Sequence, residues 1–575
     1  MNLRMNTDRN ILAGALLFIF VFCLALSAPA QTKSSSRVLF VPLDDRPPTF
    51  QWVVRMGEIG DAEVVAPPRA LLGRFTEFGK PDEIVAWIEK QDLKSFDAAV
   101  ISVDMLAYGG LVAMREHRTD LATARRRLAF LREMKRRAPR LKIYASSVIM
   151  RLAPTGTPEN ESYRNDLSRW AEISVDPVLR TETAALEKRI PPAALADYRA
   201  ARARDLAINL ASIELVRERV VEQLILGQDD AKPKGVHVAD RERLLAEVAK
   251  SNLEKQIGVQ PGADELSMLQ LARALGDKYS YRPRIKAVYS SEAIRRQVMP
   301  YEDRPLHRTV SFQIESVGAR EVESEAEADI LFFVYASRFE PGAAEKFSEL
   351  IESNLRLRRG AETVMRRDSK PFIVADIDPK GDVQGADPKF ADQLRYKMIF
   401  AQLSGYAAWN TAGNTVGTAL PHGFIFELGK KRGQSTKAVI PTAEFNRLRL
   451  MRKRVHAAQT WFLLNRVLDD YVYHSLVRPE AIKFAREKGW NVLRLDQEQT
   501  RAVEQFSAPR VRAKLRENLD SFSVSPFARS ACVQIENFKF TLPWGRTFEA
   551  ELDYDIVCRD LDEPAKRPVR QLRQL

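Results

Sequence analysis

The chain has 575 residues, 45% of them hydrophobic, and a formal net charge of +13. This length allows two or three domains, or one large barrel with additions, and the hydrophobic fraction is that of an ordinary globular protein. The basic residues are spread through helical segments such as 125–127 and 135–137, and neither zinc-finger spacing nor an RNP-like strand is present. We therefore expect solvated helix faces and no nucleic-acid partner.

The first 30 residues have the pattern of an export signal. Two arginines precede an apolar run over residues 11–26, and Ala-Pro-Ala follows in the form of a cleavage site. We expect residues 1–30 to be a signal peptide, residues 31–37 to be a disordered linker, and the mature protein to be periplasmic or extracellular. Retention of the run as a membrane anchor is the alternative, although it is short for a span. Cleavage would leave no stable membrane span.

Short apolar runs alternate with helical patterns through most of the chain, and this βαβ spacing favours a parallel sheet with right-handed crossovers. We predict an α/β domain over residues 38–428 that forms a modified TIM-barrel-like sheet. A barrel needs only eight strands, so a second doubly wound unit between Tyr289 and Thr418 is the alternative. The ten predicted strands are residues 38–43, 63–66, 98–103, 142–149, 223–227, 257–260, 285–289, 329–335, 372–375 and 406–409.

Two regions depart from this alternation. Residues 158–220 are rich in Ala and Arg and helical in pattern, so we expect a helical insertion that forms a lid or a side wall over the sheet. Residues 429–575 are predicted to form a C-terminal helical region that ends in a β-hairpin. Cys532 and Cys558 flank that hairpin, and export permits a disulfide between them, with two isolated buried thiols as the alternative.

Polar side chains stand at the ends of several predicted strands, where α/β proteins bind their ligands. Each acid alone has a competing role as a helix N-cap. Adjacent acids cannot both cap one helix, however, and clustered carboxylates need a cation, a proton or sugar hydroxyls to balance them. We therefore expect an acid-lined pocket. The predicted substrate-binding residues are Asp44, Asp45, Arg46, Asp104, Tyr108, Arg151, Asp229, Asp230, Asp376, Trp409, Asn410 and Asn414.

Asp264 and Glu265 are the predicted catalytic residues. Neighbouring carboxylates push their pKa values apart, which suits one as a proton donor and the other as an ionised partner. Their Gly-x-Asp-Glu pattern resembles the catalytic pair of exported β-hexosaminidases. That resemblance implies that Glu265 is the general acid and that Asp264 orients an acetamido group of the substrate. The competing role is structural, with Asp264 as a cap of the following helix and Glu265 near its positive end.

Trp409, Asn410 and Asn414 predict a sugar-binding wall, because an aromatic face stacks on C–H bonds while amides bind hydroxyls. The alternative is a buried tryptophan beside a turn rich in Gly and Asn. The histidines show no H-x-H or H-E-x-x-H pairing, and the acids after Asp376 lack the full pattern of a calcium loop. We therefore predict no metal site and no cofactor.

Five longer motifs together are similar to domain-of-unknown-function family 4127 of bacterial exported proteins. The similarity extends from residue 37 to about residue 471. It implies that the loops carrying these motifs are important, and it names no reaction. The motifs are PLDDRP at residues 42–47, DMLAYGGL at 104–111, GQDDAKPKG at 227–235, PGADE at 261–265 and WNTAGNTVGTAL at 409–420.

These patterns predict an exported hydrolase that uses paired carboxylates to cleave a glycosidic bond in an amino-sugar-containing polymer. The expected partner is a carbohydrate or another small polar substrate. Two alternatives are kept: a non-catalytic glycan-binding or envelope protein, which would not need several acids at one cavity, and a hydrolase that depends on a carboxylate-bound metal.

Overall fold

The computed structural model describes residues 36–359, 362–365, 368–435, 439–519, 524–525 and 528–561. The predicted signal peptide and residues 31–35 of the predicted linker lie outside these ranges. Residues 36 and 37 do not belong to a linker, because they are already part of the first strand, β1 (Ser36–Val41). Within the part of the chain that is described, no helix is long and apolar enough to cross a membrane.

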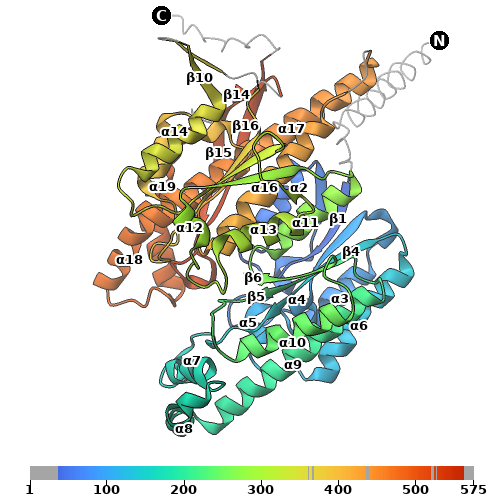
Figure 1. Cartoon of the computed structure of the whole chain (residues 1–575), viewed down its shortest axis with the longest axis vertical. Coiled ribbons are helices and arrows are strands. Elements are labelled where there is room, and N and C mark those ends of the chain that lie inside the picture. The colour runs from blue at the N-terminus through green and yellow to red at the C-terminus, as the bar shows by residue number, and fades with distance from the viewer. Residues whose placement is uncertain are drawn as a thin grey trace, which may run out of the picture. The chain divides into compact units, whose positions relative to one another are not determined.

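Two parallel sheets form the core of the unit that begins at Ser36 (Figure 1). The first has the order β2-β1-β3-β4-β5-β6 and the second β13-β12-β9-β7-β8. Numbered along the chain, both follow the order 2-1-3-4-5, and the first adds one strand. The other bounds are β2 (Ala62–Val65), β3 (Ala98–Ser102), β4 (Lys142–Ile149), β5 (Gln223–Gln228), β6 (Ile257–Pro261), β7 (Arg284–Tyr289), β8 (Arg320–Glu321), β9 (Ile330–Tyr335), β12 (Phe372–Asp376) and β13 (Gly405–Ala407).

The α/β class and all ten predicted strands are confirmed, but the barrel is wrong. Among the described strands, β6 pairs only with β5 and β13 only with β12, so both sheets stay open. A barrel would require these outer strands to pair onward, whereas the chain starts a new sheet at β7. The alternative of a second doubly wound unit is closer to the structure, although that unit begins with Arg284.

The first sheet is buried on both faces, which explains why its strands are continuous apolar runs in the sequence. In β1, Val38 and Phe40 belong to one core, and Leu39 and Val41 belong to another. The outer core is covered by α3 (Pro81–Glu89), α4 (Val103–Tyr108), α6 (Leu121–Arg137), α9 (Pro192–Arg217) and α10 (Val236–Lys250). The core shared with the second sheet contains α2 (Gln51–Ile59), α11 (Leu266–Lys278), α13 (Leu306–Ser316) and α16 (Ala412–Arg432).

The predicted insertion is helical, and its helices lie beside the first sheet. The long helix α9 packs against α6, α10, β4 and β5, and α7 and α8 lie at one end of it (Figure 1). The shorter elements of the chain are α5 (Leu111–Met114), α7 (Arg164–Ile173), α8 (Arg180–Arg189), α12 (Glu292–Arg296), α14 (Ala343–Leu355), α15 (Pro388–Tyr396) and the antiparallel pair β10 (Arg356–Arg359) and β11 (Glu362–Met365).

The C-terminal region consists of helices followed by the predicted hairpin. Its antiparallel strands pair Cys532 opposite Cys558, and a disulfide joins the two residues. Both the hairpin and the disulfide are therefore confirmed. The elements are α17 (Thr442–Arg466), a π-helix (Val467–Val477), α18 (Arg478–Glu487), α19 (Gln497–Leu519), β14 (Val524–Ser525), β15 (Ser530–Thr541) and β16 (Glu551–Asp560).

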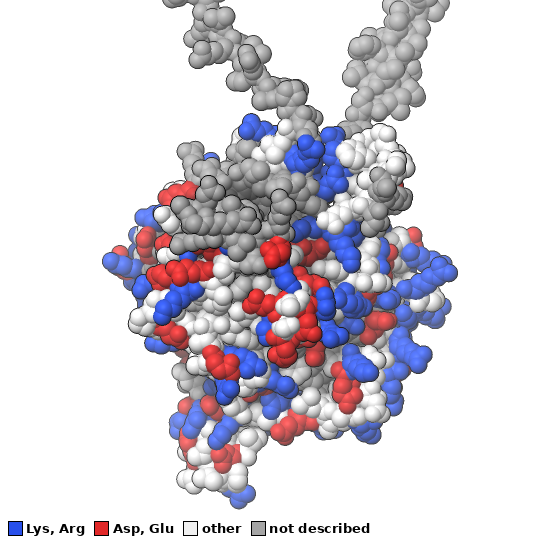
Figure 2. Space-filling view, turned by 45° about the horizontal axis from the view of Figure 1, so that its top comes forward, with Lys and Arg blue, Asp and Glu red and all other residues white. Residues whose placement is uncertain are grey.

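The charged side chains of the described surface are mixed in sign on the face shown in Figure 2. Lys and Arg lie beside Asp and Glu over most of that face. Ion pairs within one helix or between elements occur among the described residues, such as Arg136 with Glu133 and Arg132 with Glu218. The basic runs of the sequence are thus partly balanced by acids where they fold.

Candidate active site

A cavity of about 310 Å³, called here the central cavity, lies where loops from both sheets meet. Its walls come from the segments that follow β1, β3, β4, β5 and β6 of the first sheet and β12 and β13 of the second. The turn of the C-terminal hairpin adds a further wall. The predicted site residues that line the cavity are Arg46, Arg151, Asp229, Asp230, Asp264, Asn410 and Asn414.

Backbone strain is concentrated at this cavity. Six non-glycine residues that line it have φ between 44° and 65°, and the other seven described residues of this kind are spread over the rest of the chain. Such conformations cost about 1–3 kcal/mol each and gather at active sites and ligand clamps. The central cavity is therefore the strongest candidate site of the described chain. The six residues are Phe75, Asp230, Tyr301, Gln384, Asn410 and Trp544.

One wall of the cavity is built on a cluster with more acids than bases, of which Arg46, Asp264 and Arg546 line the cavity and the other acids lie behind them. Arg46 Nη2 donates to Asp44 Oδ2 at 2.8 Å and to Asp264 Oδ1 at 2.6 Å, and its Nη1 donates to Glu549 Oε1 at 2.9 Å. Arg546 Nη2 donates to Glu549 Oε2 at 2.6 Å. These five residues form what we call the acid-rich wall. Three buried carboxyl groups face two guanidinium groups there, so one negative charge is left unbalanced.

Asp264 is the member of the acid-rich wall at which this excess has chemical consequences. Burial raises the pKa of Asp264 to about 6, and the nearby Asp44 and Glu549 add to the rise, although Arg46 opposes it. Asp264 lines the central cavity. A carboxyl group in this position holds a proton up to about pH 6 and faces the space where a ligand would lie.

Another part of the cavity wall carries more bases than acids. Arg115 Nη2 donates to Asp229 Oδ2 at 2.5 Å, and Arg151 Nη1 donates to Asp230 Oδ2 at 2.7 Å. Arg164 adds a third guanidinium, and we call these five residues the base-rich wall. Burial acts to raise the pKa of Asp229, but Arg115 and Arg151 outweigh it and hold that pKa below its usual value. Asp229 is therefore ionised.

Glu265 does not face the cavity. It has no exposed surface, and its Oε2 accepts a hydrogen bond from Asn414 Nδ2 at 2.8 Å, while Asn414 itself lines the cavity. A Cβ at Gly262 would lie 1.7 Å from Glu265 Oε1, and one at Gly417 would lie 2.3 Å from Glu265 Cγ. The glycines of two sequence motifs thus make room for this carboxyl group. Burial raises the pKa of Glu265 to about 8.

Asn414 connects Glu265 to a row of amides on the cavity wall. Its Oδ1 accepts from Asn410 Nδ2 at 2.9 Å, and Asn410 Oδ1 accepts from Gln384 Nε2 at 3.2 Å. The predicted amide surface is therefore present, and the structure adds Gln384 to it. Glu265 orients the end of this row from behind.

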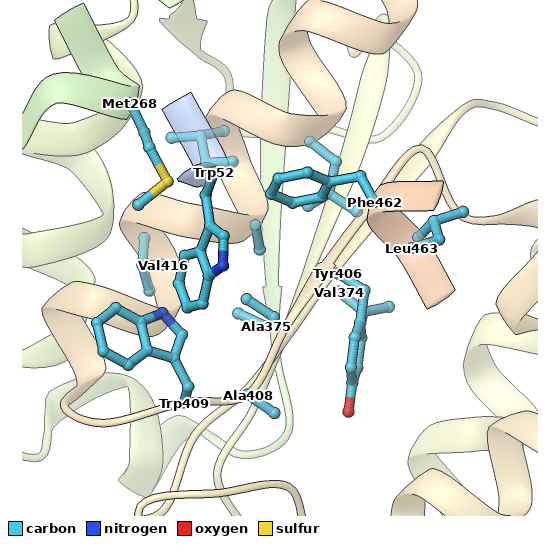
Figure 3. Close-up of a cluster of buried hydrophobic side chains, with 14 of the residues drawn as sticks. Trp52, Met268, Val374, Ala375, Tyr406, Ala408, Trp409, Val416, Phe462 and Leu463 are labelled. Atoms are coloured by element: carbon cyan, nitrogen blue, oxygen red, sulfur yellow. The ribbon is translucent and has the colours of Figure 1, made fainter. Parts of the chain in front are cut away.

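Trp409 belongs to the hydrophobic core, as Figure 3 shows. Its ring lies edge-on to Trp52 with 4.9 Å between ring centroids, and its Nε1 donates to Thr418 Oγ1 at 2.9 Å. Only 1% of the residue is exposed. The expectation of a sugar-facing Trp409 is wrong, and the alternative of a buried tryptophan beside a turn is what the structure contains.

Trp544 supplies the aromatic wall instead. Its ring stacks on Phe75 with 5.5 Å between centroids, and its Nε1 donates to Asp45 Oδ1 at 2.7 Å. The Arg46 guanidinium lies 4.7 Å from the ring centroid of Trp544, which is a cation–π distance. The hairpin turn is thus held against the loop after β1, and Asp45 acts by holding Trp544 rather than by lining the cavity.

Asp104, Tyr108 and Asp376 do not line the cavity. Asp104 accepts a hydrogen bond from Val148 N at 3.0 Å inside the first sheet, and burial raises its pKa well above the usual value. Asp376 accepts from Asp387 N at 2.9 Å, and burial raises its pKa in the same way. These acids therefore bind backbone N–H groups, of β4 in the first case and of the N-cap of α15 in the second. Tyr108 is buried at the end of α4.

Among the described residues, no three His, Cys, Asp or Glu side chains are grouped so as to hold a metal ion.

Several cavity residues were not predicted from the sequence. The charged and aromatic residues that the prediction missed lie beyond the strand ends on which it relied. A signal existed for the hairpin turn, where the segment from Pro543 to Glu549 interrupts the strand alternation with aromatic and charged residues. The missed residues that line the cavity include Phe75, Arg115, Arg164, Tyr301, Gln384, Trp544, Arg546 and Phe548, and Glu549 lies behind them.

Comparison with known proteins identifies a family but no activity. The model of a family described as "Protein of unknown function (DUF4127)" matches residues 38–553. This range includes the ten strands, the central cavity and most of the hairpin. No curated protein matches the chain.

Proposed function

The chain belongs to the DUF4127 family, which has no described activity, and from the cavity we propose that it is an exported hydrolase that cleaves a glycosidic bond. The observation that carries this proposal is the pair of carboxyl groups with opposite electrostatic surroundings. Asp264 holds a proton up to about pH 6, while Asp229 is kept ionised by Arg115 and Arg151. Two carboxyl groups whose pKa values are pushed apart are what acid–base cleavage of a glycoside needs.

In the proposed reaction, Asp264 protonates the oxygen of the leaving sugar as the glycosidic bond breaks. Asp229 acts on the other side of the anomeric carbon, where it takes a proton from the attacking water or attacks as a nucleophile. Arg46 orients Asp264 through two hydrogen bonds, of 2.6 and 3.2 Å. The proton-donor role that the sequence assigned to Glu265 moves to Asp264, because only Asp264 lines the cavity.

The remaining walls suit a sugar. Phe75, Trp544 and Phe548 line the cavity and add apolar surface for C–H bonds. Asn410, Asn414 and Gln384 offer amide donors and acceptors for hydroxyls. An amino-sugar-containing polymer is the first substrate class to test, since the Asp264–Glu265 pattern resembles that of β-hexosaminidases.

The test is a hydrolysis screen of the purified mature protein on aryl glycosides and peptidoglycan fragments. A general acid contributes about 10²–10⁴-fold to the rate, so Asp264→Asn should lower kcat by that factor. Glu265→Gln should keep kcat within about tenfold and mainly raise KM, because Glu265 orients Asn414. The exposed Asp82, on α3, provides the control variant Asp82→Asn, which should match wild type.

Each outcome of this screen has a defined meaning. A fully active Asp264→Asn variant would contradict the assignment of the acid. A loss in Glu265→Gln as large as that in Asp264→Asn would return the acid role to Glu265.

A non-catalytic glycan-binding protein is the second candidate, and one observation favours it. Asp229, Asp230 and Asp264, the three acids that line the cavity, are all ion-paired with arginines. A protein that only binds has no need of a carboxyl group free to move a proton. Binding of oligosaccharides by calorimetry without turnover of any of them would support this candidate over the hydrolase.

A further inference from the structure

A second cavity adjoins the first on the side of the helical insertion. Its volume is about 540 Å³, and we call it the insertion cavity. Arg115 and Thr155 line both cavities, and Arg115 Nη1 donates to Thr155 Oγ1 at 2.9 Å. The insertion forms much of its outer wall through the segment before α7, α7 itself and the start of α9. These two hydrogen-bonded side chains therefore stand between the central cavity and the insertion cavity.

The insertion cavity is polar and balanced in charge. Three arginines and three acids line it, and the other lining side chains include threonines, an asparagine and two tyrosines. Arg118 and Glu116 are paired at 2.7 Å. This lining suits hydroxyl and amide groups more than a charged group. The six charged residues are Arg115, Arg118, Arg494, Glu116, Glu159 and Asp197.

The central cavity has one positive charge to spare, at Arg164, whose neighbours Pro154 and Tyr163 line the insertion cavity. On the base-rich wall, Arg115 and Arg151 are paired with Asp229 and Asp230, but Arg164 has no carboxylate partner among the described residues. Its Nε donates to Pro154 O at 3.1 Å, which leaves both terminal nitrogens for another acceptor. Burial and the charge of Arg151 lower the pKa of Arg164. An anion beside Arg164 would relieve this repulsion.

We propose that the insertion cavity is a second sugar subsite, and that the ligand is an oligosaccharide with a singly charged acidic unit against Arg164 and a neutral unit in the insertion cavity. This inference rests on the proposed function only in taking the ligand to be a carbohydrate. One spare positive charge matches a carboxylate or a sulfate ester, which carry one negative charge each. A phosphate monoester carries nearly two charges and would be left unbalanced. Planar guanidinium groups bind such oxyanions through two parallel hydrogen bonds.

Calorimetry on the full mature chain carrying Asp264→Asn separates binding from turnover. The charged probes are tetrasaccharides in which an acidic unit alternates with a neutral one: a hyaluronan fragment, a peptidoglycan glycan fragment and a keratan sulfate fragment. The neutral probes are tetra-N-acetylchitotetraose and the methyl ester of the hyaluronan fragment. We expect at least one charged tetrasaccharide to bind tenfold or more tightly than either neutral probe. Comparing the affinities of the two carboxylated probes with that of the sulfated probe shows whether the acidic group is a carboxylate or a sulfate ester.

Three variants, made in the Asp264→Asn background, locate the binding. Arg164→Met should weaken the preferred charged tetrasaccharide at least tenfold, and Arg164→Lys should recover part of that loss. Tyr163→Ala, in the insertion cavity, should weaken the tetrasaccharide and leave the affinity for its acidic monosaccharide unchanged. Arg169→Met is the matched control, because Arg169 is on the same helix and is paired with Glu182 outside both cavities.

The inference and the proposed function fail in different ways. Equal binding of charged and neutral probes, absence of binding by every charged probe, or an unaffected Arg164→Met variant would overturn the inference. Cleavage of a neutral oligosaccharide by wild type would still support the hydrolase in those cases. Charged probes that bind through Arg164 but are not cleaved by wild type would instead leave the second subsite in place and remove the hydrolase.

Discussion

The two walls of the central cavity use the same residue types in opposite arrangements. On the acid-rich wall, Arg46 is shared by carboxyl groups from three parts of the chain, the nearest being Asp44 and the farthest Glu549, 503 residues away. On the base-rich wall, Asp229 and Asp230 each have an arginine of their own. On the acid-rich wall, neighbouring acids raise the pKa of a carboxyl group, so it stays protonated to a higher pH. On the base-rich wall, neighbouring arginines lower the pKa of a carboxyl group, so it stays ionised to a lower pH.

The position of each wall in the first sheet accounts for this difference. β1 lies between β2 and β3, where the strand order reverses, so the loop after it is open to partners from β6 and from the hairpin. The base-rich wall follows β3, β4 and β5, which are consecutive neighbours in the sheet. Its ion pairs therefore form between adjacent loops.

The largest expected effect is a difference in folding stability between two variants, one that removes Arg46 from the acid-rich wall and one that removes Arg164 from the base-rich wall. Arg46→Met leaves Asp44, Asp264 and Glu549 buried without their shared partner, and breaking a buried ion pair in this way costs about 3–5 kcal/mol. Arg164→Met removes a guanidinium without an acid partner and should change stability by less than about 1 kcal/mol. Urea unfolding followed by circular dichroism measures both. Equal losses in the two variants would contradict the asymmetry of the walls.

The hairpin disulfide should matter next. It closes a loop with a sequence separation of 26 residues, and that loop carries Trp544 and Glu549 to the acid-rich wall. Replacing Cys532 and Cys558 together by Ala should lower the unfolding free energy by about 3 kcal/mol. Wild type in the presence of a reductant should show the same loss. If the double variant unfolded at the same urea concentration as wild type, the bond would have no part in holding the acid-rich wall.

The smallest expected effect is a pair of opposite pH dependences. The pKa of Asp264 is raised to about 6 from a usual 3.8, so its contribution to stability is present at low pH and is lost as pH rises from about 4 to 6. The free energy of unfolding of Asp264→Asn, measured relative to that of wild type, should therefore rise by about 2–3 kcal/mol between pH 3.5 and 6.5. The pKa of Asp229 is lowered, so its contribution is lost as pH falls below about 4.

Asp229→Asn should accordingly be most destabilised, relative to wild type, at the upper end of the same pH range. Urea unfolding at several pH values between 3.5 and 6.5 gives both trends. Trends of the same sign for the two variants would mean that the walls do not differ in their hold on protons.

The local features of the fold were predictable from the sequence. Apolar runs such as residues 98–103 indicate burial on both faces of a strand, and this depends on neighbours within a few residues. The acids and amides at strand ends were found in the same way, and Arg46, Asp229 and Asp264 do line the central cavity. Parallel pairing places the carboxyl ends of the strands at the same edge of a sheet. The existence of a polar site at that edge could therefore also be inferred from the sequence.

The tertiary structure alone decided closure, exposure and charge balance. In the structure, β6 and β13 are edges of two open sheets. Pairing between strands so far apart in sequence has no local signal. The sequence therefore could not distinguish two open sheets from one closed barrel. Trp409 ends a predicted β-strand and Trp544 lies in the turn of the predicted hairpin, yet the first packs on Trp52 and the second lines the cavity. Whether Asp264 or Glu265 faces the cavity likewise depends on glycines from a distant helix and on an arginine from the loop after β1. Burial and charge are summed over neighbours in space rather than along the chain.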